Sequence, residues 1–479
     1  MTAPRLIPMI VAVALFMENM DSTVIATSLP AIAADLGTSP LTLKLAVTSY
    51  LLSLAVFIPI SGWTADRFGT RTVFRAAIAV FVLGSIGCAA SQSITQFVLA
   101  RIVQGMGGAM MTPVGRLVLV RTIDRRALVD AMAWVSIPAM VGPLLGPPLG
   151  GFITTYASWH WIFLINVPIG FLGIGLVTRY IENIRAPVPD RFDTSGMVLS
   201  GIAVAGLSFG LSVAGFDLIP WPIVVALLAG GAIAFLLYLR HARHVAAPVL
   251  DFNLLKLPTF RASVLGGFLF RIGVGALPFL LPLLLQVGFR FTPFQSGLVT
   301  FTATLGAIGM KTSAAAILRR FGFRTVLTVN AVLSALFIAA CAMFAVTTPI
   351  AVMVAILLVG GFFRSLQFTA VNAIAYAEVP AEKMSRATSL TAVAQQVSLS
   401  AGVAIGALAV ETMVRLKAQP AIDASDFPAA FLVVGLITAV SALVFLRLPP
   451  DAGEEMADRL PRPAAGDQRA VTRKPVAST

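Results

Sequence analysis

The seven residues Arg67-Phe68-Gly69-Thr70-Arg71-Thr72-Val73 return almost unchanged as Arg320-Phe321-Gly322-Phe323-Arg324-Thr325-Val326. Each copy follows the second apolar run of a block of six such runs, so the two copies occupy matching positions. A chance match is the alternative interpretation, but the matching positions favour a duplication. Internal repeats related by an axis along the membrane normal are an architecture of secondary transporters, whose substrate site lies between the repeats.

The composition around these repeats is that of a chain solvated by lipid. Hydrophobic residues make up 58% of the 479 residues, charged residues make up 11%, and the mean hydropathy is +0.92. Soluble domains carry about 25% charged residues, so a soluble multidomain protein is excluded. The apolar runs are long and unbroken, which excludes the short alternating strands of an outer-membrane barrel. The sequence therefore predicts an all-α polytopic membrane protein.

The length and the repeat offset predict how many helices span the membrane. A spanning helix takes about 20 apolar residues, so a chain of this length holds about fourteen with short loops. The apolar runs are 6–30, 45–65, 73–91, 96–120, 128–154, 161–182, 195–215, 221–240, 260–287, 294–317, 324–345, 349–376, 388–412 and 428–447. The two heptapeptides are 320 − 67 = 253 residues apart, a distance that holds about two spans more than the six expected between matching positions of adjacent six-span blocks. The seventh and eighth spans are therefore an insertion.

Four segments follow from this division. They are an N-terminal six-helix bundle at 1–183, a linker with two inserted helices at 184–255, a C-terminal six-helix bundle at 256–448 and a disordered cytoplasmic tail at 449–479. The tail is rich in Pro, Ala and charged residues and has almost no large apolar side chains, a composition typical of disorder.

Lysine and arginine are distributed unequally between alternate loops. One set of loops carries nineteen before the tail, and the other carries only Lys44, Arg290, Arg415 and Lys417. The positive-inside rule places the richer set in the cytoplasm. We therefore expect a multi-pass protein of the cytoplasmic (inner) membrane with both termini in the cytoplasm. The net charge of +13 then requires no nucleic-acid partner.

Four further stretches resemble signatures of a known transporter family. They are Gly-Trp-Thr-Ala-Asp-Arg-Phe-Gly-Thr-Arg at 62–71, Met-Asp-Ser-Thr-Val-Ile at 20–25 with Leu-Pro at 29–30, Gly-Pro-Leu-Leu-Gly-Pro-Pro-Leu-Gly-Gly at 142–151, and Trp-His-Trp-Ile-Phe-Leu-Ile-Asn-Val-Pro-Ile-Gly at 159–170. Together they resemble the major facilitator superfamily and its fourteen-span drug:proton antiporter branch. The segments 105–111, 271–273 and 310–311 resemble one group of multidrug exporters within that branch. The resemblance implies the major facilitator fold, two six-helix bundles plus two inserted central helices.

The first span contains two acidic residues, Glu18 and Asp21, which share one helix face because they are three residues apart. Glu18 lies about 20 Å along the helix from Arg5, near mid-membrane. Two carboxylates this close repel each other, which favours proton binding by one of them. Alternatively, both only neutralise an arginine or cap a broken helix. The resemblance implicates the Asp21 position in proton coupling, whereas Glu18 stands where the family often has an uncharged residue.

The fourth span carries Arg101 and Gln104 on one face, followed by Gly105 and Gly108, which permit close helix approach. This pattern resembles a family motif whose arginine is linked to proton coupling. A purely structural pair between Arg101 and a carboxylate is the alternative.

Ionisable residues inside a span are functional candidates because their burial is costly. Together with Gln104, the second-half residues Arg271, Lys311 and Arg364 are candidates for a central cavity. These three cations have no deep acidic partner nearby in sequence. They either pair across the cavity with Glu18 and Asp21 or face a water-filled vestibule. An unpaired surplus favours anionic or zwitterionic substrates over the lipophilic cations usual for the branch.

Two glycine-containing motifs are candidate gates. Gly62, Asp66, Arg67, Gly69 and Arg71 lie at the cytoplasmic turn after the second span, where a charge-based latch between the halves is expected. A solvated loop is the alternative interpretation.

In the fifth span, the glycines leave a strip free of side chains and the prolines bend the helix. The motif residues are Gly142, Pro143, Gly146, Pro147, Gly150 and Gly151. The resemblance implies an antiporter motif that seals the outer side against proton leak, away from the cavity carboxylates. Helix packing without a transport role is the alternative.

These patterns predict a proton-coupled secondary transporter that exports small amphipathic molecules by alternating access. The alternative is an importer or uniporter of a small anionic or zwitterionic solute on the same fold. An ATP-driven pump is disfavoured because Gly-Lys, part of every Walker A loop, occurs nowhere in the sequence. An enzyme is disfavoured too, because no cluster of His, Cys and acidic residues offers a metal site. We expect protons, substrate and lipid as partners, no cofactor, and a monomer.

Overall fold

The computed structural model describes residues 3–123, 128–185, 193–213, 219–245, 248–311, 313–380, 383–418 and 421–453. Side chains are described in the same ranges except at 3–5 and 128–140. Across the described residues, regular structure is helical throughout. The predicted tail at 449–479 lies outside the described residues from 454 onward.

The first nine helices form what we call the first half. They are α1 (Ala3–Val24), α2 (Leu29–Asp35), α3 (Lys44–Phe57), α4 (Ser61–Phe68), α5 (Thr70–Ala89), α6 (Ile94–Thr122), α7 (Leu128–Tyr156), α8 (Trp161–Leu164) and α9 (Asn166–Tyr180). Between α3 and α4 the chain forms a 3-10 turn at Ile58–Ile60. Pro59 in this turn has no backbone N–H to donate to a regular α-helix.

Two helices follow and then the second half. The two are α10 (Thr194–Val213) and α11 (Trp221–Ala242), and the second half is α12 (Pro258–Leu283), α13 (Pro293–Lys311), α14 (Ala314–Phe321), α15 (Phe323–Ala340), α16 (Ile350–Ile374), α17 (Met384–Leu416) and α18 (Phe427–Phe445). Helices α11, α12 and α18 have proline in their first turn, where a missing N–H costs no hydrogen bond. The last turn of the α12 span is a π-helix at Leu284–Gly288.

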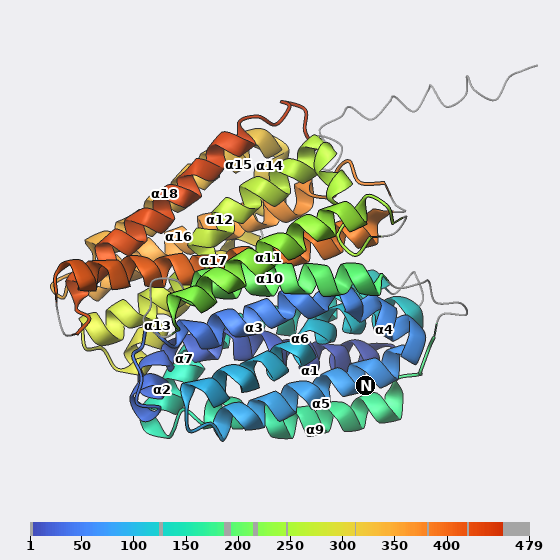
Figure 1. Ribbon diagram of the computed structural model, residues 1–479, viewed down its shortest axis with the longest axis horizontal. Coiled ribbons are helices and arrows are strands. Elements are labelled where there is room, and N and C mark those ends of the chain that lie inside the picture. The colour runs from blue at the N-terminus through green and yellow to red at the C-terminus, as the bar shows by residue number, and fades with distance from the viewer. Residues whose placement is uncertain are drawn as a thin grey trace, which may run out of the picture.

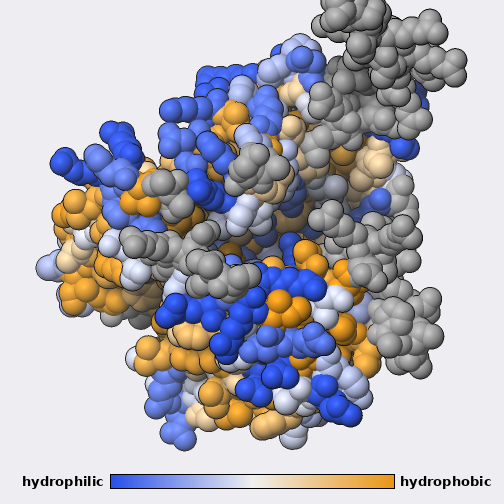
Figure 2. Space-filling model, turned by 90° about the vertical axis from the view of Figure 1, so that its right-hand side faces the viewer, coloured by the Kyte–Doolittle hydropathy of each residue, from blue (hydrophilic) through white to orange (hydrophobic). Residues whose placement is uncertain are grey.

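The two halves lie one above the other with their helices running along the same direction (Figure 1). Two helix pairs join them, α3 with α17 and α7 with α13. Helix α10 packs on α11 and touches both α3 and α17, so the pair α10–α11 lies along the seam between the halves. Seen from the end that carries the N-terminus, the surface has hydrophilic residues gathered on it and is hollowed between the two lobes (Figure 2).

The repeated heptapeptide adopts the same turn twice. Both α4 and α14 are eight-residue helices that stop at a glycine with positive φ, Gly69 at +94° and Gly322 at +77°. Glycine is required there because other residues rarely adopt a left-handed backbone. A shared backbone conformation at matching positions supports a duplication over a chance match of letters.

Eleven helical segments in the described residues are long and apolar enough to cross a membrane, or twelve if the bent pair α13 and α14 is one span. The axes of that pair differ by 60° within the single run predicted at 294–317. Helices α6 and α7, 29 residues each, are not among the eleven. Arg101, Gln104 and several glycines lower the hydropathy of α6. The chain is thus an all-helical polytopic protein.

Candidate functional site

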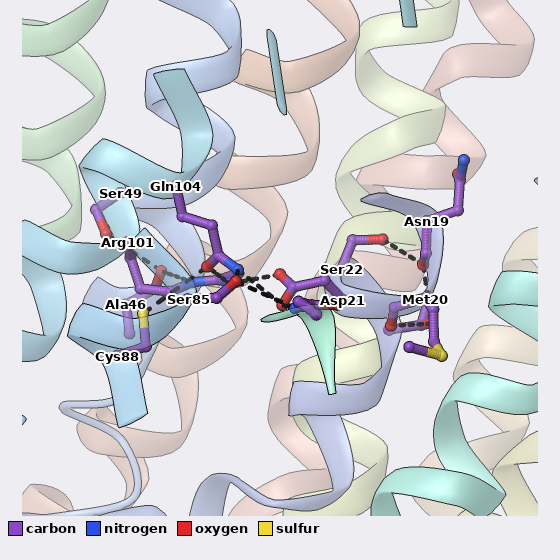
Figure 3. Close-up of polar contacts among 12 residues, drawn as sticks. Asn19, Met20, Asp21, Ser22, Ala46, Ser49, Ser85, Cys88, Arg101 and Gln104 are labelled. Atoms are coloured by element: carbon purple, nitrogen blue, oxygen red, sulfur yellow. Dashed lines mark hydrogen bonds and ion pairs between the residues drawn. The ribbon is translucent and has the colours of Figure 1, made fainter. Parts of the chain in front are cut away.

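A buried ion pair joins two helices of the first half. Asp21 lies in the last turn of α1 and Arg101 lies in α6, with exposed fractions of 0% and 1%. Nη1 of Arg101 lies 2.7 Å from Oδ2 of Asp21. Figure 3 shows the two side chains pointing toward each other from neighbouring helices. This is the pair between the fourth-span arginine and a carboxylate that the structural alternative predicts, and it is compatible with proton coupling.

Two side-chain amides complete the shell of Asp21. Nε2 of Gln104 donates to Oδ1 of Asp21 at 2.8 Å, and Nδ2 of Asn166 donates to the same oxygen at 3.0 Å. Both amides also donate to the Ser85 hydroxyl oxygen, at 2.7 and 3.1 Å. Asp21 therefore accepts three hydrogen bonds, one of them from a cation, which compensates the burial of its charge.

Arg101 is held from other sides as well. Its Nη1 donates to Oε1 of Gln104, and its Nε donates to the Ala46 carbonyl at 3.4 Å. The guanidinium lies 4.2 Å from the centroid of the Tyr50 ring, a favourable cation–π distance. Helix α6 can approach α3 this closely because a Cβ on Gly105 would meet the Ser53 Cβ at 2.6 Å.

Glu18 lies one turn before Asp21 and has a different partner. Its Oε2 accepts a hydrogen bond from the Thr112 hydroxyl at 2.7 Å. Both acids of α1 thus face α6, as their spacing predicts. Glu18 has a neutral partner where Asp21 has a guanidinium, so a proton on Glu18 breaks no ion pair.

A cavity of about 600 Å³ lies between the halves. It is lined by Thr23 and Ala26 of the α1 span, by two residues of α7, and by residues of α12, α13 and α16. Lys311 and Arg364 are in the lining, and none of the described residues that line the cavity carries a carboxylate. Of the four predicted cavity residues, Gln104 and Arg271 are outside the lining.

Arg271 nevertheless contacts the cavity wall. Its Nη2 donates to Oδ1 of the lining residue Asn372 at 2.7 Å, and its guanidinium lies 5.4 Å from the ring centroid of Phe368, also in the lining. Asp21 pairs with Arg101 instead of with a second-half cation, so of the two alternatives left open for those cations, pairing across the cavity does not apply to Asp21. Helix α6 packs directly on α1 and brings its arginine closer than any second-half cation.

The predicted cytoplasmic gate residues lie within the first half. Asp66 pairs with Arg121 at the end of α6, so this charge pair does not link the two halves as expected. The guanidinium of Arg67 lies 6.0 Å from the Trp63 ring centroid. The Asn183 side chain occupies the space beside Gly69, whereas a Cβ added at Gly62 would meet nothing within 4 Å. Arg71 lies in the first turn of α5 and is half-buried.

The glycines of the fifth-span motif allow α7 to pack against two elements. A Cβ on Gly142, Gly146 or Gly150 would meet atoms between Phe16 and Thr27, in α1 and the 3-10 turn that follows it. Gly151 faces Pro293 and Phe294 at the start of α13 instead. Pro143 and Pro147 line the cavity, and Gly142 faces Asn19 and Met20, which lie between Glu18 and Asp21, so the expectation that the motif lies away from these carboxylates is wrong. Helix α7 thus presents its prolines to the cavity and Gly142, Gly146 and Gly150 to the α1 span.

Several contacts close the end of the cavity at which α1 ends. Nε2 of Gln286 donates to the Thr27 carbonyl at 2.9 Å, and the backbone N–H of Phe294 donates to the Thr155 hydroxyl at 3.1 Å. The Phe294 ring packs against Phe152 and Tyr156 of α7. We call this the closed end, because first-half and second-half residues meet there directly.

Three residues of the site were not assigned a role from sequence: Ser85, Asn166 and Thr112. Asn166 does fall in the stretch 159–170 that resembles the family. Its signal is a polar amide inside an otherwise apolar run. A polar residue in an apolar run does not reveal its partner, so the contact with Asp21, 145 residues away in the sequence, could not be predicted.

Comparison with known proteins agrees with this architecture. The profile of the Major Facilitator Superfamily matches residues 11–258 and 263–477. The "Putative multidrug resistance protein MdtD" of Salmonella typhimurium (strain LT2) is 40% identical over 463 residues, covering 93% of this chain and 95% of that protein. The protein of the same name from Salmonella heidelberg (strain SL476) is 39% identical over 459 residues, with the same coverage. The multidrug resistance name of these relatives agrees with the resemblance found in segments 105–111, 271–273 and 310–311.

Proteins of known structure share the fold at low identity. A D-xylose–proton symporter superimposes with a TM-score of 0.66 at 15% identity, covering 94% of this chain and 98% of that one. The nucleoside transporter NupG superimposes with a TM-score of 0.64 at 13% identity, covering 93% and 98%. With the family profile matching nearly the whole length, and two halves packed around a central cavity, the chain belongs to the major facilitator superfamily.

Proposed function

We propose that the chain is a proton-coupled exporter of small amphipathic molecules that works by alternating access in the inner membrane. The observation that carries this proposal is the buried pair of Asp21 and Arg101, whose acid lies in the same span as Thr23 and Ala26 of the cavity lining. The name of the 39–40% identical relatives, a multidrug resistance protein, supports substrates of the efflux type. A buried carboxylate inside a span supplies a group that can take up and release a proton.

We propose fourteen spans with both termini in the cytoplasm. The eleven apolar segments, the bent pair α13–α14, and helices α6 and α7 add up to fourteen. At 1.5 Å per residue, a 29-residue helix is about 43 Å long, longer than a bilayer core of about 30 Å. The division at 183, 255 and 448 and the excess of Lys and Arg in alternate loops belong to the same proposal.

In this orientation the closed end faces outward, so the conformation is inward-facing. On either side of Asp21, α1 packs against α7: Gly142 faces Phe16, Asn19 and Met20, and Gly146 faces Thr23 and Val24. Protonation of Asp21 removes its attraction to Arg101, and the two helices lose a buried ion pair. Because α1 is packed on α7 in the same stretch, this change reaches the helix that closes the outer end. We propose that this contact couples the proton to the opening of the cavity.

The cavity favours a second candidate for the substrate class. Lys311 and Arg364 line it without a carboxylate among the lining residues. A cavity with two cations attracts anionic or zwitterionic molecules and repels lipophilic cations, since charges in a site of low dielectric interact strongly. Import or uniport of such a solute on the same fold therefore stays an alternative to export of cations.

The experiment is a substrate panel in everted membrane vesicles with an imposed pH gradient. Amphipathic cations, anions and zwitterions are added in turn, and dissipation of the gradient is followed with a pH-sensitive dye. Exchange is expected to dissipate the gradient for at least one class in the wild type and for none in Asp21→Asn. Uptake of labelled substrate that is the same with and without the gradient would overturn proton coupling.

A further inference from the structure

Asn166, the first residue of α9, has an unusual hydrogen-bond balance. Its side chain is fully buried, and its Nδ2 donates to Asp21 and to Ser85. Its Oδ1 is buried too, but no hydrogen-bond partner reaches it. A buried acceptor without a partner is rare and costs stability, so it requires an explanation.

The shell around Asp21 suits only the ionised carboxylate. All three partners, Nη1 of Arg101, Nε2 of Gln104 and Nδ2 of Asn166, are N–H donors that cannot accept a hydrogen bond. A protonated carboxyl carries an O–H that needs an acceptor. If Asp21 is to hold a proton inside this cluster, one partner must present an oxygen to it.

The three partners differ in whether they can do so. The guanidinium of Arg101 has no acceptor atom. The Oε1 of Gln104 already accepts from Nη1 of Arg101 and from the Cys88 thiol, so turning this amide would set its NH2 against a guanidinium. Asn166 has an oxygen that nothing engages. A half-turn of its amide exchanges two atoms of nearly equal size and breaks no bond to Arg101. The NH2 group then takes the position where Oδ1 now lies, so one amide group stays without a partner in either orientation.

We propose that the Asn166 amide turns over when Asp21 is protonated, so that Asn166 donates to the ionised form and accepts from the protonated form. The inference rests on the proposed function, in which Asp21 carries the proton. The proton adds to Oδ1 of Asp21, because Oδ2 stays with Arg101, and no other covalent bond forms or breaks. Oδ1 of Asn166 then accepts from Asp21 and from the Ser85 hydroxyl, which reverses the present role of that hydroxyl as an acceptor.

Asp21 is also surrounded by other charged or titratable groups, and we assign the acceptor of its proton to Asn166 and not to any of them. They are Glu18 on α1, Tyr50 on α3, Cys88 on α5 and Arg101 on α6. Arg101 keeps its charge at every pH of interest and so attracts the ionised form only. Asn166 is therefore a positioning residue: it stabilises whichever protonation state is present.

The test is infrared difference spectroscopy of the full chain in lipid between alkaline and acidic pH. Asparagine labelled with ¹³C at the side-chain carbonyl identifies asparagine bands in the wild type without any substitution. Asp21→Asn assigns the carboxyl band, and Asn166→Leu, with Asn166→Ser as a second variant, assigns the amide band. Asn330→Leu is the matched control, because Asn330 is also buried with an unpartnered Oδ1 but faces no carboxyl.

We expect the Asn166 carbonyl band to shift to lower frequency as Asp21 takes its proton, and the shift to be absent in Asp21→Asn. The Asn330 band should stay unchanged across the same titration. If the Asp21 carboxyl band appears while the Asn166 band does not move, the inference about Asn166 is wrong and the proton role of Asp21 stands. If no Asp21 carboxyl band appears at any pH that supports transport, both the inference and the proposed proton role fall.

Discussion

Gly151 and Pro293 meet across the two halves so closely that a Cβ on Gly151 would lie 2.3 Å from the Pro293 carbonyl oxygen. A second close approach, between Gly297 and the Pro147 carbonyl, lies beside it at the same distance. Helices α7 and α13 therefore touch backbone to backbone, and no side chain fits between them. The closed end of the cavity depends on glycine at these two positions.

Gly151→Leu should hold the outer end open, because the added side chain cannot enter the contact with α13. A cysteine introduced at the cavity residue Ala303 should then react faster with a membrane-impermeant thiol reagent added outside cells. An increase of about tenfold is expected for a loss of roughly 1.4 kcal/mol from the closed state. The native Cys88 and Cys341 are buried and give little background. Gly230→Leu, at a position with nothing within 4 Å, is the control, and equal rates in both variants would contradict the prediction.

Asp21→Asn should abolish uphill export while membrane insertion stays intact, because an amide cannot carry a proton. Accumulation of substrate against its gradient in proteoliposomes is the measurement. Glu18→Gln, tested alongside, shows whether the neighbouring acid carries the proton instead. A variant Asp21→Asn that still concentrates substrate would show that Asp21 is not the essential carrier.

Removing one charge of the buried pair should destabilise the protein more than removing both. Arg101→Gln leaves the Asp21 carboxylate buried without its cation, at an expected cost of about 3–5 kcal/mol. The double variant Asp21→Asn with Arg101→Gln leaves no buried charge and should recover most of this loss. Thermal unfolding in detergent compares the two. The prediction fails if the double variant unfolds at a lower temperature than Arg101→Gln alone.

The two cations of the cavity, Lys311 and Arg364, should determine whether anionic or cationic substrates bind. Arg364→Gln and Lys311→Gln should weaken binding of anionic substrates by about tenfold, if each contact contributes roughly 1.4 kcal/mol. Binding of lipophilic cations should be unchanged or improved. Arg75→Gln, on the exposed face of α5, is the matched control. Equal losses for anions and cations would indicate that the two residues have a structural role only.

A reporter fused after Thr479 tests the orientation. With fourteen spans and a cytoplasmic N-terminus, the C-terminus also lies in the cytoplasm. A reporter that works only in the cytoplasm should therefore be active when it is fused after Thr479. Activity of a periplasmic reporter at the same position would contradict both the even number of spans and the orientation.

The helical spans can be predicted from the sequence because each apolar run must be buried in lipid or protein. The run at 73–91 corresponds to α5, and the run at 324–345 corresponds to α15 with its final turn, Cys341–Met343. Side-chain partners could not be predicted in this way. Hydropathy gives no distance between helices, so both the pairing of Asp21 with Arg101 and a pairing with second-half cations were compatible with the sequence.

The gate motif illustrates the same limit. Arg67 and Asp66 belong to a recognisable pattern, but the partner of Asp66 is Arg121, which no pattern singled out. The partner depends on where α6 ends relative to α4, and hydropathy does not specify the close approaches of α6 to α3 at Gly105 and to α5 at Gly107. Motif recognition therefore found the residue types of the site but not their geometry.

Helix α10 packs on α3 of the first half and on α17 of the second, while α3 and α17 also pack on each other. When the halves rock to expose the cavity on the other side, as alternating access requires, we expect at least one of these three contacts to change. Apolar surface at the seam is then uncovered on one helix and covered on another in each turnover. We therefore expect the position of the equilibrium between the two conformations to depend on α10, which the sequence predicts to be part of an insertion between the duplicated halves.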